Sequence, residues 1–217
     1  MEGIEILPED ISNYDISFKV TVIGDSDTGK TYLIFNQTIN YFDNNQNYKD
    51  RVNFSNFNIR YNNRVIKLQI WDTPGAEIYR SLNINYYRNS SLVIIAYSII
   101  MKNSFEHVEN FLREVRDVNP NAKIVLVGTK LDLEDSREVS KDEAENFVKE
   151  HYLDMLFEIS AISANDTKKV FIEAAKLLFT QYLKSEKEKE ERKNAEKKEE
   201  DKKNINPKKK ERHCHIF

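Results

Sequence analysis

Short apolar runs alternate along the chain with segments whose apolar residues recur at helical spacing. Residues 18–23, 92–98 and 123–128 are nearly continuous apolar runs, which are typical of strands covered on both faces of a parallel sheet. Residues 104–117 place their apolar side chains on one helical stripe, with Ser104 as the expected N-cap. Strands that alternate with helices predict an α/β fold with a doubly wound, mostly parallel, six-stranded sheet and helices on both faces.

Weaker patterns complete the predicted order of elements. The two Asn residues at 62 and 63 lie between alternating segments, which favours a hairpin. Ser140, three residues before Glu143, predicts the start of a helix. The remaining predicted elements are strands at 52–61, 64–71 and 156–160, a helix from Ser140, and a last helix whose apolar face covers 170–178.

The last part of the chain loses its apolar stripe at about Lys184. It is either an extension of the last helix, held by pairs such as Glu188 with Arg192, or a solvated linker. The predicted organisation is an extension able to dock on the body (1–16), one domain (17–183) and a charged tail (184–217).

Charge separates the tail from the body. The tail carries 13 Lys and Arg against nine Asp and Glu, so its charge is +4 and that of the rest is −7. An acidic body excludes nucleic acid as the expected partner. The sequence shows neither a signal-peptide pattern nor an apolar run of about 18 residues, and its one Cys cannot form an internal disulfide, which favours the reducing cytosol.

The segment Gly24 to Thr31 matches G-x-x-x-x-G-K-[ST] directly after a predicted strand and before a predicted helix. Backbone N–H groups and the helix N-terminus are expected to surround a β-phosphate, while Lys30 bridges β- and γ-oxygens and the Thr31 hydroxyl binds Mg²⁺. The predicted nucleotide-binding residues of this loop are Gly24, Asp25, Ser26, Asp27, Thr28, Gly29, Lys30 and Thr31.

Two further motifs follow strands. Asp72 is expected to support the same Mg²⁺, and the N–H of Gly75 is available to a γ-phosphate, so Lys30 and Gly75 are the predicted catalytic residues. A carboxylate at Asp132 accepts two hydrogen bonds from guanine that adenine cannot donate. The predicted base site consists of Thr129, Lys130 with its stem over the base, Asp132, and the backbone N–H groups of Ser160 and Ala161.

These motifs together resemble the Ras superfamily of small GTPases over about Ser17 to Tyr182. The segments GDS, KLQIWDT, YYR and SFEHVENFLRE are most similar to the Rab branch. The resemblance implies the small G-protein fold of the P-loop NTPases and a monomer that binds GTP or GDP with Mg²⁺. It also implies effectors, an exchange factor, an activating protein and a prenyl-binding escort protein as partners. The effector surface is expected at an aromatic triad of Phe54, Trp71 and Tyr86, for which core packing is the alternative role.

Several positions depart from the family pattern. Lys49 stands where the family has a Mg²⁺-binding Thr, and Arg51 where it has Gly. Ala76 replaces the Gln that orients the attacking water, which predicts slow hydrolysis. Asp27 replaces a Gly of the phosphate loop, which predicts weaker affinity or faster exchange, and Ile162 replaces a Lys of the base loop.

The only cysteine, Cys214, lies fourth from the end in CHIF, a C-a-a-X form with terminal Phe that favours geranylgeranylation, although His215 is atypical there. The neighbouring Lys208, Lys209, Lys210 and Arg212 supply a second membrane signal. The predicted location is the cytoplasmic face of an endomembrane or the plasma membrane, with a cytosolic pool. A C-a-a-X end with a single cysteine and a basic stretch is as much Ras- or Rho-like as Rab-like, and TKLD is also Rho-like.

Three functions are compatible with these residues. The first is a membrane-tethered, Rab-like GDP/GTP switch that recruits effectors. The second is a pseudo-GTPase that acts as a non-catalytic adaptor, as Lys49, Ala76 and Asp27 suggest. The third, a P-loop kinase, is disfavoured, because TKLD fits guanine and the sequence indicates no second substrate site.

Overall fold

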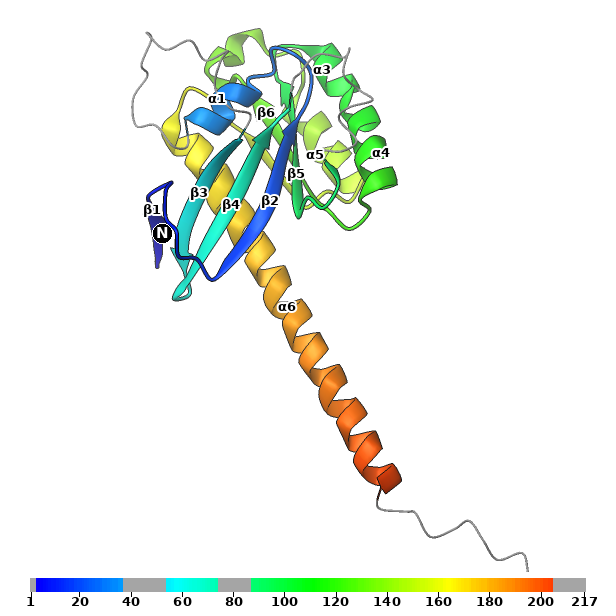
Figure 1. Ribbon diagram of the computed structural model, residues 1–217. Helices are drawn as coiled ribbons and strands as arrows, with labels where there is room; N and C mark the ends of the chain where they lie inside the picture. Colours follow the sequence, from blue (N-terminus) through cyan, green and yellow to red (C-terminus); the bar gives the residue numbers. More distant parts are fainter. Residues whose placement is uncertain (1–2, 37–53, 74–86, 205–217) are drawn as a thin grey trace, which may run out of the picture. The chain divides into compact units, whose positions relative to one another are not determined.

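A seven-stranded sheet forms the centre of the first of two compact units, Met1–Leu178 and Phe179–Phe217 (Figure 1). The computed structural model describes residues 3–36, 54–73 and 87–204. The strands are β1 (Ile4–Leu7), β2 (Ile16–Ile23), β3 (Phe54–Tyr61), β4 (Arg64–Asp72), β5 (Leu92–Ser98), β6 (Lys123–Thr129) and β7 (Met155–Glu158). The helices are α1 (Lys30–Phe35), α3 (Lys102–Glu106), α4 (Val108–Val118), the 3₁₀ helix η3 (Leu131–Ser136), α5 (Lys141–Glu150) and α6 (Ala164–Asn204).

The strands lie in the order β1-β3-β4-β2-β5-β6-β7. The pairs β4–β2, β2–β5, β5–β6 and β6–β7 are parallel, and β1–β3 and β3–β4 are antiparallel. The mostly parallel α/β sheet is therefore confirmed. The count of six strands is wrong, because Ile4–Leu7 of the N-terminal extension pairs with β3 as a seventh strand.

The predicted hairpin between β3 and β4 is confirmed. Asn62 and Asn63 have φ values of 50° and 57°, the left-handed conformation that Asn tolerates in a two-residue turn. Tyr61 pairs with Arg64 directly across this turn, and Phe54 pairs with Trp71 at the other end of the hairpin. The hairpin register thus brings the two aromatic residues of the predicted effector surface together.

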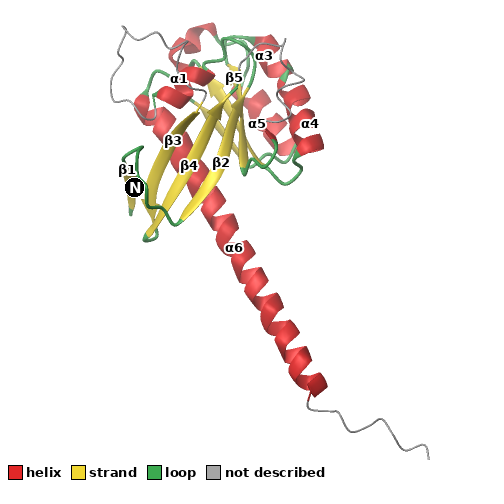
Figure 2. Cartoon of the chain, viewed as in Figure 1, coloured by secondary structure: helices red, strands yellow, loops and turns green. Residues whose placement is uncertain are grey.

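Helices cover both faces of the sheet, as the sequence predicts (Figure 2). On one face, side chains of β5 and β6 such as Val93, Ile95 and Leu126 pack in one buried cluster with residues of α3, α4 and α5. On the other face, the ring of Phe57 in β3 lies 5.8 Å from that of Phe171 in α6. Because β5 is buried at all seven positions, it forms the middle of the core.

The predicted helix at 104–117 is two helices that meet at His107, which ends α3 and precedes α4. Ser104 is not an N-cap: it lies inside α3, where its buried hydroxyl donates to the Met101 carbonyl at 2.7 Å. The cap at Ser140 is confirmed, since its Oγ accepts from the Glu143 N–H at 3.2 Å. The N-cap predicted at Ser140 is therefore correct, whereas the one predicted at Ser104 lies about one turn after the start of α3.

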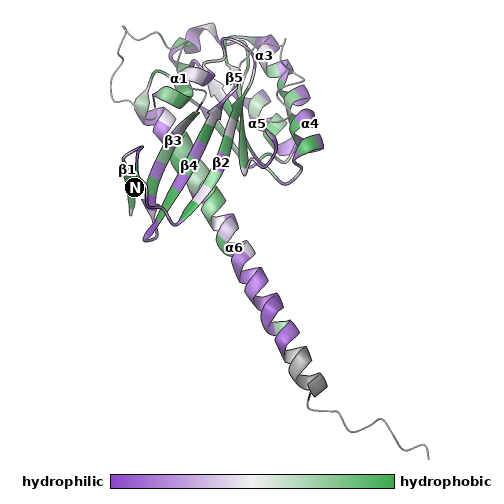
Figure 3. Cartoon of the chain, viewed as in Figure 1, coloured by the Kyte–Doolittle hydropathy of each residue, from purple (hydrophilic) through white to green (hydrophobic). Residues whose placement is uncertain are grey.

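In the second unit, the described chain is helical as far as Asn204, which is the first of the two alternatives for the tail. Figure 3 shows mostly hydrophilic residues along the part of α6 that it colours beyond the apolar first turns. The ion pairs Lys189–Glu186 at 2.8 Å and Lys187–Glu191 at 4.0 Å lie along its surface. Among the residues described, no helix combines the length and apolar content needed to cross a bilayer.

Candidate nucleotide site

The phosphate loop connects β2 to α1 and has little room for side chains. Gly24 has φ +141°, and a Cβ there would lie 2.1 Å from the Ala96 carbonyl oxygen, so only glycine fits. Gly29 precedes α1 with φ +80°. Asp27 adopts φ +62° although it is not glycine, and its side chain is exposed. The loop therefore keeps the left-handed backbone that a glycine at this position would favour.

Lys30 lies inside this loop. The residue is only 5% exposed, and its ammonium group donates to the Asp25 carbonyl oxygen. Burial lowers the pKa of Lys30, and the carboxylates of Asp72, Asp25 and Asp27 oppose that shift. A buried ammonium beside a loop of backbone N–H groups is suited to an anion with several oxygens, such as a di- or triphosphate.

Thr31 and Asp72 form the predicted metal pair. The Thr31 hydroxyl donates to Asp72 Oδ2 at 3.0 Å, and Asp72 Oδ1 is buried without a partner among the described residues. Burial raises the pKa of Asp72, while Thr31 and Lys30 lower it. Hydroxyl and carboxylate oxygens fit Mg²⁺, which commonly takes one or two protein ligands and completes its shell with phosphate oxygens and water. When bound, Mg²⁺ supplies positive charge for phosphate oxygens.

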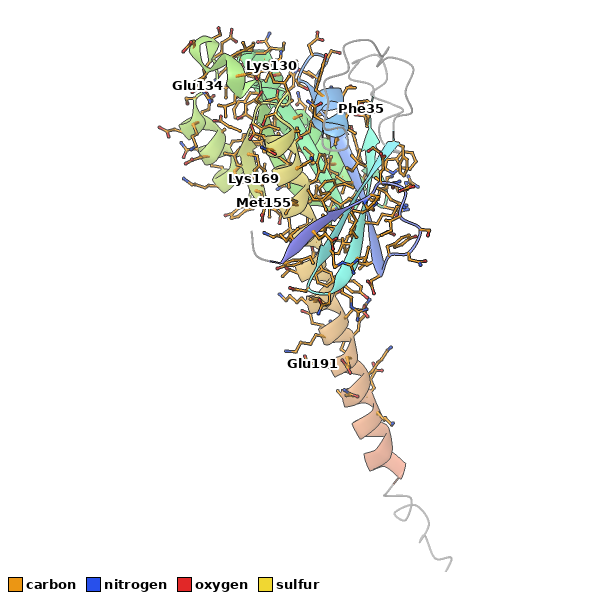
Figure 4. All side chains as sticks on the ribbon, turned by 90° about the vertical axis from the view of Figure 1, so that its left-hand side faces the viewer. Phe35, Lys130, Glu134, Met155, Lys169 and Glu191 are labelled. Atoms are coloured by element: carbon orange, nitrogen blue, oxygen red, sulfur yellow. The ribbon has the colours of Figure 1, made fainter. Side chains whose placement is uncertain are left out.

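The base loops lie at the ends of β6 and β7. Lys130 has φ +66° and lies at the same end of the sheet as α1 (Figures 1 and 4). Asp132 is exposed, and the Ser160 hydroxyl donates to its Oδ1 at 2.6 Å. The Ser160 N–H, which the sequence predicts to face the base, donates to Asp166 Oδ2 at 3.3 Å.

Two side chains tie the phosphate loop to the base loops. Thr129 Oγ1 lies 2.7 Å from the Thr28 carbonyl oxygen and 3.0 Å from that of Tyr97, and its hydroxyl donates to these oxygens. Asn36, which ends α1, donates through Nδ2 to the Ala161 carbonyl oxygen at 2.7 Å. The motifs 24–31, 129–132 and 160–161 are therefore brought together. Asn36 has no motif of its own, so the sequence offered no signal for it.

His107 is a second residue that the motifs did not reveal. Its Nδ1 lies 2.6 Å from Asp25 Oδ2, and the side chain of Asp25 is 14% exposed. The other oxygen, Asp25 Oδ1, is buried without a partner in the described parts of the chain. The junction of α3 and α4 is thereby attached to the phosphate loop, across 82 residues of sequence.

The strand that precedes Ser160, β7, is held by an ion pair. Arg137 donates to both carboxylate oxygens of Glu158, at 2.6 and 2.8 Å, and also to Glu134. Glu158 is close to the Tyr97 hydroxyl as well, at 3.4 Å. This bidentate, largely buried pair fixes the end of β7 just before the base loop begins.

The aromatic pair of the predicted effector surface is present. The rings of Phe54 and Trp71 lie 4.9 Å apart in an edge-to-face arrangement, and both residues are half-buried. The ammonium of Lys19 lies 5.8 Å from the Trp71 ring. Each ring therefore keeps some surface open to solvent. The third residue, Tyr86, lies outside the described residues, as do Lys49, Arg51, Gly75, Ala76 and Cys214.

Comparison with known proteins agrees with this geometry. A family model described as the Ras family matches residues 19–180, which is most of the chain and includes all three motifs. Small GTPases of this family bind GTP and GDP with Mg²⁺, the ligands that the phosphate loop, the Thr31–Asp72 pair and the base loops fit. The chain therefore belongs to the Ras family of small GTPases.

Proposed function

We propose that this protein is a Rab-like member of the family, a membrane-tethered GDP/GTP switch that recruits effectors in vesicle trafficking. The nucleotide switch in this proposal is supported best by the convergence of buried Lys30, the Thr31–Asp72 pair and the Asp132–Ser160 pair at one end of the sheet. The Rab-like part rests on the similarity of the segments GDS, KLQIWDT, YYR and SFEHVENFLRE. In this proposal Lys30 and the Gly75 N–H hold phosphate oxygens, and Asp132 selects guanine. Phe54, Trp71 and Tyr86 bind effectors.

Intrinsic hydrolysis is proposed to be slow. Ala76 has no side-chain group that orients water, and Lys49 is an ammonium, which cannot be a metal ligand. Single-turnover hydrolysis of bound GTP with Mg²⁺ tests this. The proposal expects a slow rate that rises in Ala76→Gln, and a complete lack of phosphate release in both proteins contradicts it.

Membrane tethering depends on the end of the tail. Cys214 is the proposed site of a geranylgeranyl group, beside Lys208, Lys209, Lys210 and Arg212. The expected location is the cytoplasmic face of an endomembrane or the plasma membrane, with a cytosolic pool. Incubation with a prenyltransferase and labelled geranylgeranyl diphosphate is expected to label the protein but not Cys214→Ser, and equal labelling of both contradicts the site.

A pseudo-GTPase that serves as a non-catalytic membrane adaptor is the second candidate. The observation in its favour is Asp27, whose carboxylate adds negative charge to a loop proposed to hold phosphates. In that case GTP and GDP would leave the protein rapidly, and effector binding would not depend on which nucleotide is added. Pull-down of effectors with GDP and with a non-hydrolysable GTP analogue separates the two functions.

A further inference from the structure

The N-terminal segment, residues 3–15, lines the edge of the sheet without entering the core. Its strand β1 runs antiparallel to β3, from Ile4 opposite Tyr61 to Leu7 opposite Asn58. No residue from 3 to 15 is buried, and Ile6 is 44% exposed. Little apolar surface is therefore removed from water when this segment docks.

Polar contacts with β3 hold the segment at Pro8 and Glu9, directly after β1. Asn58 Nδ2 donates to the carbonyl oxygens of Pro8 and Glu9, at 2.6 and 3.1 Å. The Glu9 carboxylate then accepts from Ser55 Oγ at 3.2 Å and from the Asn56 N–H at 3.1 Å. Pro8 has no N–H for a ladder, so the side chain of Glu9 continues the pairing where the strand stops.

The end of the segment next to β2 is attached to β4, through Tyr14 and Asp15. Asp15 accepts from Arg64 Nη1 at 2.8 Å and from the Val65 N–H at 2.7 Å, and its own N–H donates to the Val65 carbonyl oxygen. These bonds from Val65 and Arg64 lower the pKa of Asp15. The ammonium of Lys67 also lies 5.2 Å from the Tyr14 ring. Asp15 therefore fixes the segment where β2 begins, so residues 4–9 can leave β3 while the rest stays attached.

With residues 4–9 docked on β3, two polar atoms of β3 have no hydrogen-bond partner among the described residues. Asn56 Oδ1 and Asn58 Oδ1 are buried and have no hydrogen-bond partner in the parts of the chain that the structure describes. A buried polar atom without a partner lowers the stability of the folded arrangement that contains it, and both of these residues also bind the N-terminal segment. The ion pair between Glu5 and Arg60 is 63% and 49% exposed, so water screens it. These contacts therefore fix the position of the segment on β3 but contribute little to the stability of its docking.

We propose that residues 4–9 are a displaceable strap, and that the β3 edge beneath it is a docking site for an extended acidic segment of a partner protein. An added strand would replace the ladder of β1. Arg60, the Ser55 hydroxyl and the Asn56 N–H, which now bind Glu5 and Glu9, would bind carboxylates of the partner. The edge ends beside Phe54 and the Trp71 ring, so a bound strand extends the aromatic surface. This inference goes beyond the nucleotide switch and does not require it.

A fluorescein-labelled peptide of residues 1–15, added to the full-length protein, tests whether the strap can be replaced. In the wild type the tethered strap competes at a high effective concentration, so the peptide binds weakly. Glu9→Gln weakens the tethered strap, and we expect the peptide to bind about ten-fold more tightly. Asp10→Asn is the matched control, because it removes the same charge from the neighbouring exposed residue; it is expected to behave as the wild type.

Two further measurements keep the result interpretable. Hydrogen exchange of the amides in β3 is expected to rise about ten-fold in Glu9→Gln and to stay unchanged in β5, which shows that the fold is intact. A peptide with Gln in place of Glu5 and Glu9 is expected to bind about ten-fold more weakly. Lack of peptide binding to all three proteins, equal effects of Glu9→Gln and Asp10→Asn, or equal binding of the uncharged peptide would each overturn the proposal. Each result is read with the bound nucleotide quantified, so a failure of the switch is seen separately.

Discussion

The phosphate side and the base side of the nucleotide site are built differently. On the phosphate side, Lys30 is buried among carboxylates, and Asp25 and Asp72 each have a buried oxygen without a partner among the described residues. On the base side, Asp132 is exposed and already held by Ser160 at 2.6 Å. The difference indicates that ligand and metal complete the phosphate side, whereas the base side is ordered in advance. Nucleotide affinity should therefore depend mainly on the phosphate side, and selectivity for guanine on the base side.

The largest effect is expected from Lys30→Ala. The variant removes the buried ammonium from the phosphate side, so we expect affinity for GDP and GTP to fall by at least about 100-fold. Titration with a fluorescent guanine nucleotide measures this. Lys141→Ala, which removes an exposed lysine, is the control and should retain affinity. Equal affinity of Lys30→Ala and the wild type would contradict the role of this residue.

Asp132→Asn tests the base side. An amide in place of the carboxylate cannot accept both hydrogen bonds from guanine, so GTP affinity should fall about 100-fold. The weak affinity for ATP should change little, because adenine does not use this carboxylate. Competition titrations with both nucleotides show whether the loss is confined to guanine. A parallel loss of both would mean that Asp132 supports the fold and not selectivity.

Asp72→Asn separates metal binding from stability. Mg²⁺ should slow nucleotide release in the wild type and do so at least about ten-fold less in the variant. Burial raises the pKa of Asp72, so its ionised form destabilises the nucleotide-free fold, and that penalty disappears as the pH falls through the raised pKa. The variant should lack this gain. Thermal unfolding in EDTA, repeated as the pH is lowered from 7 through the acidic range, measures it, and an identical gain in both proteins would contradict the assignment.

The smallest effects on nucleotide release are expected from two side chains, Asn36 and His107, that connect the loops of the nucleotide site to each other or to the helices beside them. Asn36→Ala removes the bond from α1 to the Ala161 carbonyl, and His107→Ala removes the contact with Asp25. Each loss is about 1 kcal/mol, so GDP release should accelerate about five-fold. Stopped-flow release measures both. Asn110→Ala, on the exposed face of α4, is the matched control, and an equal acceleration there would show that the change is not specific to these contacts.

The sequence predicted the parts of the site that lie in contiguous motifs. Each motif lies at or directly after the end of a strand: Gly24 to Thr31 follows β2, Asp72 ends β4, and Thr129 ends β6. Parallel strands bring their carboxyl ends to one edge of the sheet. The motifs and the strand pattern together therefore predicted that these loops lie at one edge of the sheet. The same argument could not reveal which side-chain atoms meet, so the hydrogen bond from the Ser160 hydroxyl to Asp132 was not predicted.

Other features depend on single contacts between distant residues. Nothing in the spacing of His107 or Asn36 distinguishes them from ordinary helix-end residues, because their partners lie 82 and 125 residues away. The strand Ile4–Leu7 was missed because four residues before a proline, two of them exposed and two half-buried, carry no clear period. Its pairing is specified by Glu9 and Asn58, which only the folded hairpin brings together.

Selective binding of guanine is the central property of this site, and competition between GTP and ATP for the full-length protein with Mg²⁺ measures it most directly. The arrangement of Asp132 and Ser160 beside the phosphate loop predicts that GTP binds at least about 100-fold more tightly than ATP. Equal affinity for the two nucleotides, or binding of neither, would contradict it.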